Sequence, residues 1–120
     1  MKANEPDALS KTTRINLLFD FYEPLLTEKQ RTFLKYYFHD DFSLGEISAE
    51  FGISRQAVYE HIKRAEQVLE SYEGKLNLLA KHEHLQRLTE ELADSVNGLS
   101  ISDENKKSLM SVIERFHLEE

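Results

Sequence analysis

The stretch LGEISAEFGISRQAVYEHIKR, residues 44–64, constrains the fold more than any other part of the chain. A capping box, SLGE at residues 43–46, begins a short helix whose apolar residues, among them Ile47, share one face. Gly52 follows where the chain needs a positive φ to turn sharply, and the Ser54 side-chain oxygen can cap a new helix. Helix, glycine turn and capped helix, in this order, predict a helix-turn-helix.

Further helices are predicted upstream of this motif. One is expected from Thr12 or Thr13 to just before Pro24, and another from a second capping box, TEKQ at residues 27–30. Residues 1–11 are polar and lack periodicity, so a disordered lead-in is expected there. The predicted fold is all-α.

The helix that begins at Ser54 carries an unbroken heptad seam. Its members alternate four and three residues apart: Val58, Ile62, Ala65, Leu69, Tyr72, Leu76 and Leu79. A helix continuing to Ala80 is roughly 40 Å long, too long to be covered by the short helices before it, and Gly74 is a candidate bend. We therefore predict a homodimer or helix-packing seam formed by Leu69, Tyr72, Leu76 and Leu79. The alternative to a homodimer is cover by the chain's own C-terminal helices.

Two helices are predicted in the C-terminal part of the chain. The fifth ends near Asn97 and Gly98, a favourable C-cap, and the sixth begins at Ser102. The predicted domains are a helix-turn-helix domain with a long fourth helix at residues 12–80 and a C-terminal helical pair at residues 81–120.

Charge and composition narrow the function classes. The net charge of -7 has the wrong sign for binding nucleic acid over a broad surface. Residues 54–64, however, carry Arg55, Lys63 and Arg64 against Glu60 alone, so a basic tip on an acidic body fits the sequence. No stretch resembles a membrane span or a signal peptide, so we expect a cytoplasmic protein without membrane insertion.

The chain lacks the residue patterns of a catalytic or metal site. Cysteine is absent, which excludes disulfides and thiolate ligands. His82 and His84 project from different sides of a helix. No nucleophile and base pair or Gly-rich phosphate loop has a meaningful spacing, so we expect no enzyme, metal, cofactor or small-molecule substrate.

Candidate nucleic-acid contacts lie in the first half of the fourth helix: Ser54, Arg55, Gln56, Tyr59 and Lys63. We expect Arg55 or Gln56 to contact base edges and Lys63 to contact phosphate. Arg31 and Lys35 on the second helix are expected along the phosphate backbone, with a solvated face as the alternative. Glu60 opposes this use of the helix, because a carboxylate repels phosphate.

The run from Leu25 to Glu70 resembles region 4 of bacterial sigma factors, which recognises promoters. The recognition-helix pattern is carried by Ser54, Val58, Ile62, Arg64, Ala65 and Leu69. The helix before it matches at Leu44, Glu46, Ile47, Phe51, Gly52 and Ile53. The resemblance implies a sigma region 4-like fold, whereas the chain is too short to be a free-standing sigma factor.

Over residues 12–80 the chain resembles the YlxM family of small helix-turn-helix proteins of Gram-positive bacteria more closely. The match is carried by TTRINLLFDFYEPLLTEKQ, YYFHDDFSLGEI, FGISRQAVYEHIKRAE and LESYEGKL. This resemblance implies a regulatory protein of the signal recognition particle pathway, because the family's genes usually neighbour those for that particle's components.

Two functions are therefore weighed. The first is a regulatory protein that acts in the signal recognition particle pathway through protein or RNA contacts, with the targeting GTPase or the particle's RNA as partner. The alternative is a transcriptional regulator that reads duplex DNA with the Ser54–Arg64 helix.

Overall fold

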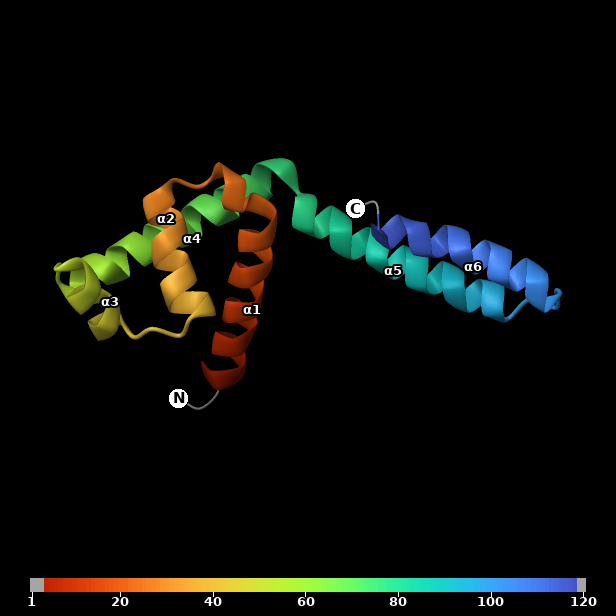
Figure 1. Cartoon of the computed structure of the whole chain (residues 1–120), viewed down its shortest axis with the longest axis horizontal. Helices are drawn as coiled ribbons and strands as arrows, with labels where there is room; N and C mark the ends of the chain where they lie inside the picture. The colour runs from red at the N-terminus through yellow and green to blue at the C-terminus, as the bar shows by residue number, and fades with distance from the viewer. Residues whose placement is uncertain (1–3, 119–120) are drawn as a thin grey trace. The chain divides into compact units, whose positions relative to one another are not determined.

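The computed structural model describes residues 4–118, with the side chains of residues 9–116, and every regular element in that range is helical (Figure 1). The elements are α1 (Asn4–Tyr22), the 3-10 helix η1 (Glu23–Leu25), α2 (Glu28–Leu34), the π-helix η2 (Lys35–His39), α3 (Leu44–Phe51), α4 (Arg55–Leu76), α5 (Leu78–Asn97) and α6 (Asp103–Leu118). The all-α prediction is confirmed. None of the helices described combines the length and apolar composition that a membrane crossing requires.

The helix-turn-helix is formed by α3, the turn at Gly52 and α4. Gly52 has φ 66°, in the left-handed region, and its N–H donates to the Ser48 carbonyl at 2.9 Å. The Ser48 hydroxyl donates to the Ile53 carbonyl across the turn. Ser54 then caps α4, because its Oγ accepts from the Ala57 N–H at 3.0 Å. The predicted turn and cap are confirmed.

Both predicted capping boxes are present. At the start of α2, Thr27 Oγ1 accepts from the Gln30 N–H at 3.1 Å, and the Gln30 side chain accepts from the Thr27 N–H at 2.9 Å. Ser43 and Glu46 make the same pair of bonds, 3.0 and 2.8 Å long, at the start of α3. Each box satisfies backbone donors that the first turn of a helix leaves without a partner.

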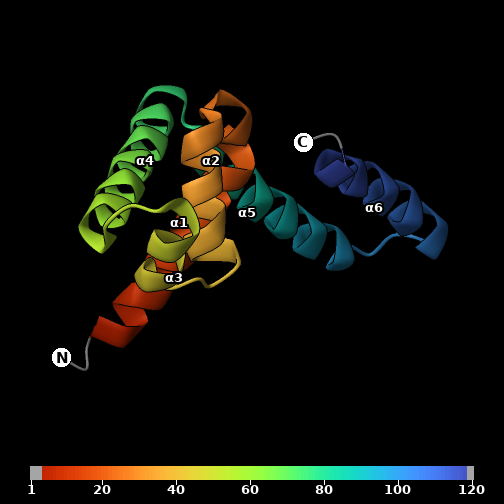
Figure 2. The same ribbon diagram turned by 60° about the vertical axis from the view of Figure 1, so that its left-hand side comes forward.

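The core of the first compact unit, which ends at Asn77, lies where α1, α2 and α3 pack against α4 (Figure 2). Its buried apolar side chains are Ile15, Leu18, Phe19, Tyr22, Leu26, Phe33, Leu34, Phe38, Ile47, Val58, Ile62, Ala65 and Leu69. Each such Val, Leu, Ile or Phe contributes about 1.5–3 kcal/mol by burial. This burial holds α4 in place and leaves its opposite face open.

The first helix is longer than the sequence predicted. α1 begins at Asn4, so the predicted disordered lead-in over residues 1–11 is wrong from Asn4 onward; residues 1–3 lie outside the described part of the chain. The prediction failed because the first turns of α1 lack an apolar repeat of their own.

The prediction that α4 continues to Ala80 is also wrong. α4 ends at Leu76, and Asn77 adopts φ 55°, a left-handed C-cap whose N–H donates to the Glu73 carbonyl at 2.8 Å. Asparagine tolerates this conformation better than other residues with a side chain, so it ends the helix where glycine commonly would. Gly74 remains within α4, and Leu79 belongs to α5.

The seam of α4 is largely covered within the same unit. Leu69 is fully buried, and the Tyr72 hydroxyl donates to the Leu25 carbonyl at 3.1 Å. The Tyr72 ring lies 5.9 Å from that of Tyr22 on α1. The expectation that the helices before α4 are too short to cover its seam is therefore wrong for the part that ends at Tyr72. Beyond it, Leu76 is 43% exposed.

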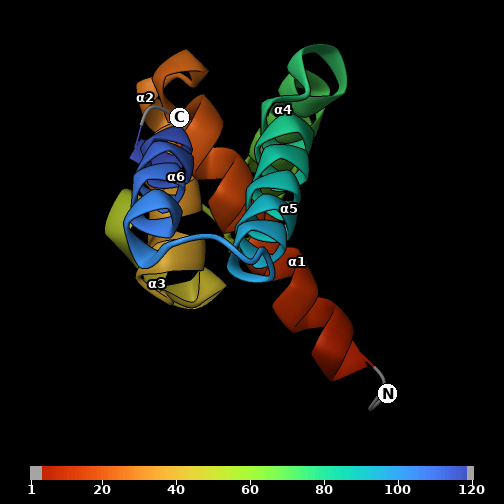
Figure 3. The same ribbon diagram turned by 90° about the vertical axis from the view of Figure 1, so that its right-hand side faces the viewer.

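The second compact unit is a helical hairpin in which α5 and α6 run side by side (Figure 3). α5 ends at Asn97, and Ser102 caps α6, because its Oγ accepts from the Asn105 N–H at 3.1 Å. Lys106 Nζ donates to the Asn97 carbonyl at 3.0 Å and ties the two ends together. Both predicted boundaries are confirmed.

Candidate nucleic-acid interface

The first half of α4 presents one polar face. Arg55, Gln56 and Tyr59 are exposed and Lys63 is half-buried, whereas Val58 faces the core. Lys63 Nζ lies 5.8 Å from the centre of the Tyr59 ring, a cation-π distance. The structure therefore places four of the side chains predicted to contact nucleic acid along one half-helix and brings Tyr59 and Lys63 together, whereas Ser54 caps the helix.

Arg55 lies against α3 at Gly45, a position for which the sequence predicts no role. A Cβ at Gly45 would lie 3.2 Å from both Nε and Nη2 of Arg55. Gly45 thus leaves room for the guanidinium at the point where the two helices of the motif approach each other. A glycine inside a helix is the only sequence signal for this close approach.

The charge of Glu60 is partly neutralised by its own helix. Gln56 Nε2 donates to Glu60 Oε2 at 3.2 Å, and Arg64 Nη2 lies 3.9 Å from Glu60 Oε1. Both Glu60 and Arg64 are mostly exposed, so this ion pair is weak. It nonetheless moderates the repulsion that Glu60 was expected to exert on phosphate.

The two cations predicted on the second helix have different surroundings. Arg31 Nη1 donates to the Leu26 carbonyl at 2.7 Å, which directs part of its guanidinium to the turn before α2. Lys35 is exposed at the first position of η2. Arg31 therefore has a structural role in addition to any contact with phosphate.

A hollow of about 260 Å³ lies beside the polar face of α4. Its lining comes from α1, η2, α3 and α4: Lys11, Thr12, Tyr37, Phe38, Leu44, Tyr59, Ile62, Lys63 and Glu66. Burial lowers the pKa of the Lys11 ammonium, but its hydrogen bond and charge interaction with Glu66 outweigh burial and hold that pKa above its ordinary value. No local sequence pattern points to Lys11, because only the folded chain brings it to α4.

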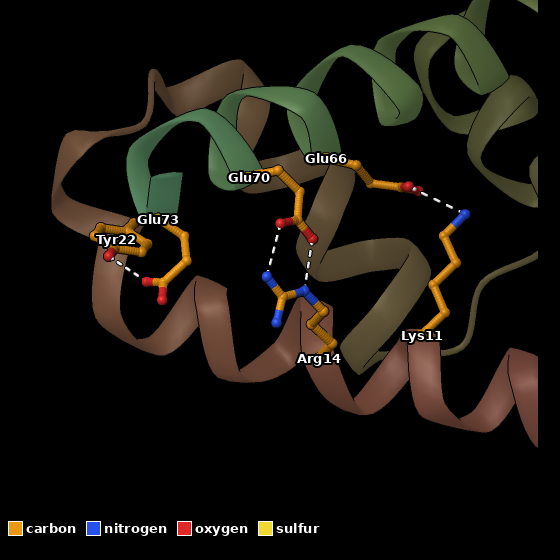
Figure 4. A network of polar contacts seen from close by, with 6 residues as sticks. All are labelled: Lys11, Arg14, Tyr22, Glu66, Glu70 and Glu73. Atoms are coloured by element: carbon orange, nitrogen blue, oxygen red, sulfur yellow. Dashed lines mark hydrogen bonds and ion pairs between the residues drawn. The ribbon is translucent and has the colours of Figure 1, made fainter. Parts of the chain in front are cut away.

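Polar contacts join α1 to the second half of α4 (Figure 4). Lys11 Nζ lies 3.1 Å from Glu66 Oε1, and the Arg14 guanidinium makes two bonds of 2.8 Å to the Glu70 carboxylate. The Arg14 bonds lower the pKa of Glu70 although burial acts in the opposite direction. These contacts neutralise two carboxylates that follow the polar face along α4.

A second hollow, of about 430 Å³, lies between α2, the turn and α4. Its aromatic wall includes Phe33 and Phe51, and the Phe33 ring stacks on His61 with centroids 4.9 Å apart. Burial, followed by the charges of Lys29 and Arg64, lowers the pKa of His61. The lowered pKa favours the neutral form of the imidazole, which is an aromatic part of this wall.

Comparison with known proteins identifies relatives over most of the chain. The model of the family UPF0122, described as "Putative helix-turn-helix protein, YlxM / p13 like", matches residues 9–110. A UPF0122 protein of Halalkalibacterium halodurans is 53% identical over 106 residues, which cover 88% of this chain and 94% of the relative. A UPF0122 protein of Bacillus thuringiensis and one of Bacillus anthracis are each 50% identical over 107 residues, 89% of this chain and 97% of the relative.

Proposed function

Because the chain belongs to the UPF0122 family of YlxM/p13-like helix-turn-helix proteins, we propose that it is a regulatory protein of the signal recognition particle pathway. In this proposal it binds nucleic acid through the first half of α4. The observation that carries the proposal is the capped, exposed half-helix that follows the Gly52 turn, with Arg55, Gln56, Tyr59 and Lys63 along it. The pathway is what the resemblance to the YlxM family implies.

The pathway is tested by affinity purification of the tagged protein from cell extract, with and without nuclease. We expect the targeting GTPase of the particle, its RNA, or both to be recovered. Loss of the GTPase after nuclease treatment would indicate that RNA bridges the two proteins. If the purified protein binds neither component at micromolar concentration, this pathway assignment is wrong.

Duplex DNA is the second candidate ligand, and the helix-turn-helix geometry favours it. The major groove of B-DNA admits an α-helix, whereas the deep, narrow major groove of an RNA duplex does not. Near the start of α4, Arg55 has the two donors that a bidentate contact to guanine requires, and Gln56 has the amide donor and acceptor that a bidentate contact to adenine requires. A gel shift with the genomic DNA beside the protein's own gene tests this function, and Arg55→Ala should weaken binding.

We also propose that the protein is a homodimer formed by the α5–α6 hairpin. Five apolar side chains of the hairpin are each 42 to 47% exposed: Leu88, Leu92, Leu109, Val112 and Phe116. Leu88 and Val112 each precede a buried residue, Thr89 and Ile113, by one position. In each helix, the residue one position before the buried one is turned by the same angle about the helix axis. Because α5 and α6 run in opposite directions, this turn brings Leu88 and Val112 to the same side of the hairpin.

We call this shared side the hairpin face. Because it is apolar, it can pack against the same face of a second copy. A two-helix layer cannot bury both of its faces by itself, and packing the hairpin faces of two copies together gives a four-helix bundle. A two-fold dimer would also present two α4 helices, as dimeric helix-turn-helix proteins do on paired half-sites.

A further inference from the structure

We infer that the hollow beside α4 holds a backbone phosphate of duplex DNA while the first half of α4 lies in the major groove. This inference rests on the DNA-binding function proposed above and adds a residue of α1, Lys11, to the interface. The added phosphate contact lies outside the helix-turn-helix, which consists of α3, the turn and α4.

The polar groups around the hollow suit a phosphate group. Lys11 and Lys63 supply ammonium groups, and Thr12, Tyr37 and Tyr59 supply hydroxyl groups. All five are hydrogen-bond donors, and phosphodiester oxygens are acceptors only. The volume of about 260 Å³ accommodates a phosphate with its flanking sugar atoms but is small for a larger ligand.

The charge balance of the hollow also favours an anion. Its charged side chains are Lys11, Lys63 and Glu66, which leave one net positive charge. Glu66 is only 8% exposed, and its carboxylate is held 3.1 Å from Lys11 Nζ. Lys11 therefore offsets the charge of the acid with one of its three N–H donors and keeps the others for a phosphate oxygen, while Lys63 supplies the excess positive charge.

The hollow is continuous with the proposed DNA-contacting face. Tyr59 and Lys63 belong to both, and their cation-π contact holds the lysine at the edge that the two share. The lining also includes Tyr37 and Phe38 from η2, a π-helix, and such segments occur often at functional sites.

The salt dependence of DNA binding tests the inference. We would measure the affinity of the full-length protein for a fluorescent duplex over a series of salt concentrations, for wild type, Lys11→Gln and Lys63→Gln. Each variant should reduce the slope of log K against log salt by about 1, because each removes one phosphate contact. Lys11→Arg should keep the wild-type slope, and thermal unfolding would show that each variant is folded.

A matched control is Lys75→Gln, which removes one exposed positive charge from the last turn of α4, away from the hollow. Its slope should equal that of wild type. If Lys11→Gln is folded and also keeps the wild-type slope, no phosphate occupies the hollow, although DNA binding itself stands. If wild type shows no salt-dependent binding to duplex DNA, the DNA-binding function fails together with this inference.

Two further ligands distinguish other sources of the phosphate. Inorganic phosphate and a single-stranded RNA would be titrated against the same proteins. Weaker binding of inorganic phosphate by Lys11→Gln, with an unchanged DNA slope, would identify a small-anion site and overturn the inference. If Lys11→Gln lowers the salt slope of RNA binding but not that of duplex DNA binding, the phosphate in the hollow belongs to RNA and the inference is overturned.

Discussion

The Tyr22 hydroxyl donates a buried hydrogen bond of 2.6 Å to Oε1 of Glu73, and so joins the last turn of α1 to the last full turn of α4 (Figure 4). Both residues are buried, and the hydroxyl lies at the end of the α1 face that covers the core. A hydrogen bond in such a place, away from competing water, is stronger than an exposed one. It closes α1 on α4 close to the residue where α4 ends.

Tyr22→Phe should lower the free energy of unfolding by about 1–3 kcal/mol, because it removes the donor of a buried hydrogen bond without removing the ring. Chemical denaturation would measure the change. Tyr72→Phe is the control, since its hydroxyl bonds to a backbone carbonyl at an exposed position and should contribute less. Equal losses in the two variants would contradict the importance assigned to burial.

Replacing Arg14 by Gln should flatten the loss of stability in acid. The pKa of Glu70 is lower in the folded chain than in the unfolded chain, so its contribution is fully present above the ordinary carboxyl pKa and is lost as pH falls through the folded value. Both side chains are nearly half exposed, so the effect should be about 0.3–1 kcal/mol. Thermal unfolding between about pH 6 and pH 3 measures it, and identical pH profiles for the two proteins would refute it.

Gly45→Ala should separate stability from DNA binding. Alanine favours the helical backbone of α3 by about 0.5–1 kcal/mol, but its Cβ would lie 3.2 Å from the Arg55 guanidinium, which would have to shift by a few tenths of an ångström. We expect unchanged or higher thermal stability together with weaker binding to DNA, as for Arg55→Ala. Unchanged DNA binding would show that the position of Arg55 over Gly45 is unimportant for recognition.

Glu66→Gln should raise the affinity for duplex DNA, because it removes the carboxylate that engages Lys11 at the hollow. The same change removes an ion pair between α1 and α4, so stability should fall slightly while DNA binding improves. Titration at low salt measures the affinity, with Glu70→Gln as a control farther along α4. Weaker binding by the Glu66 variant would argue against the phosphate site.

Aspartate in the hairpin face should dissociate the proposed dimer. Leu88→Asp or Val112→Asp would place a carboxylate in the packed interface and should give a monomer mass in analytical ultracentrifugation. Leu99→Asp changes a similarly exposed leucine in the α5–α6 connection and should leave the dimer intact. If Leu76→Asp alone dissociates it, the seam of α4 forms the interface instead; a monomeric wild type would refute dimerisation.

Much of the fold could be predicted because it depends on local rules. The capping boxes at Thr27 and Ser43, the left-handed Gly52 and the Ser54 cap each involve residues within four positions of one another. The exposed placement of Arg55 and Gln56 follows from the helical period once the apolar positions of α4 are known.

Contacts between distant segments could not be predicted in this way. No local pattern predicts the ion pair between Lys11 and Glu66 or the close approach of Arg55 to Gly45. The hollow and the position of Arg55 on α3 therefore could not be predicted. The extent of α1 was also missed, and with it the cover that this helix gives to α4.

By itself, the sequence determined the helix-turn-helix at residues 44–64 and the apolar face of its second helix, α4. The tertiary structure decided where that helix ends and what covers it. The heptad spacing continues from Leu76 to Leu79 across Asn77, and one left-handed residue interrupts a helix without interrupting the sequence period. An apolar period shows that a face needs a partner; only packing identifies that partner, which for Leu69 and Tyr72 lies within the first compact unit.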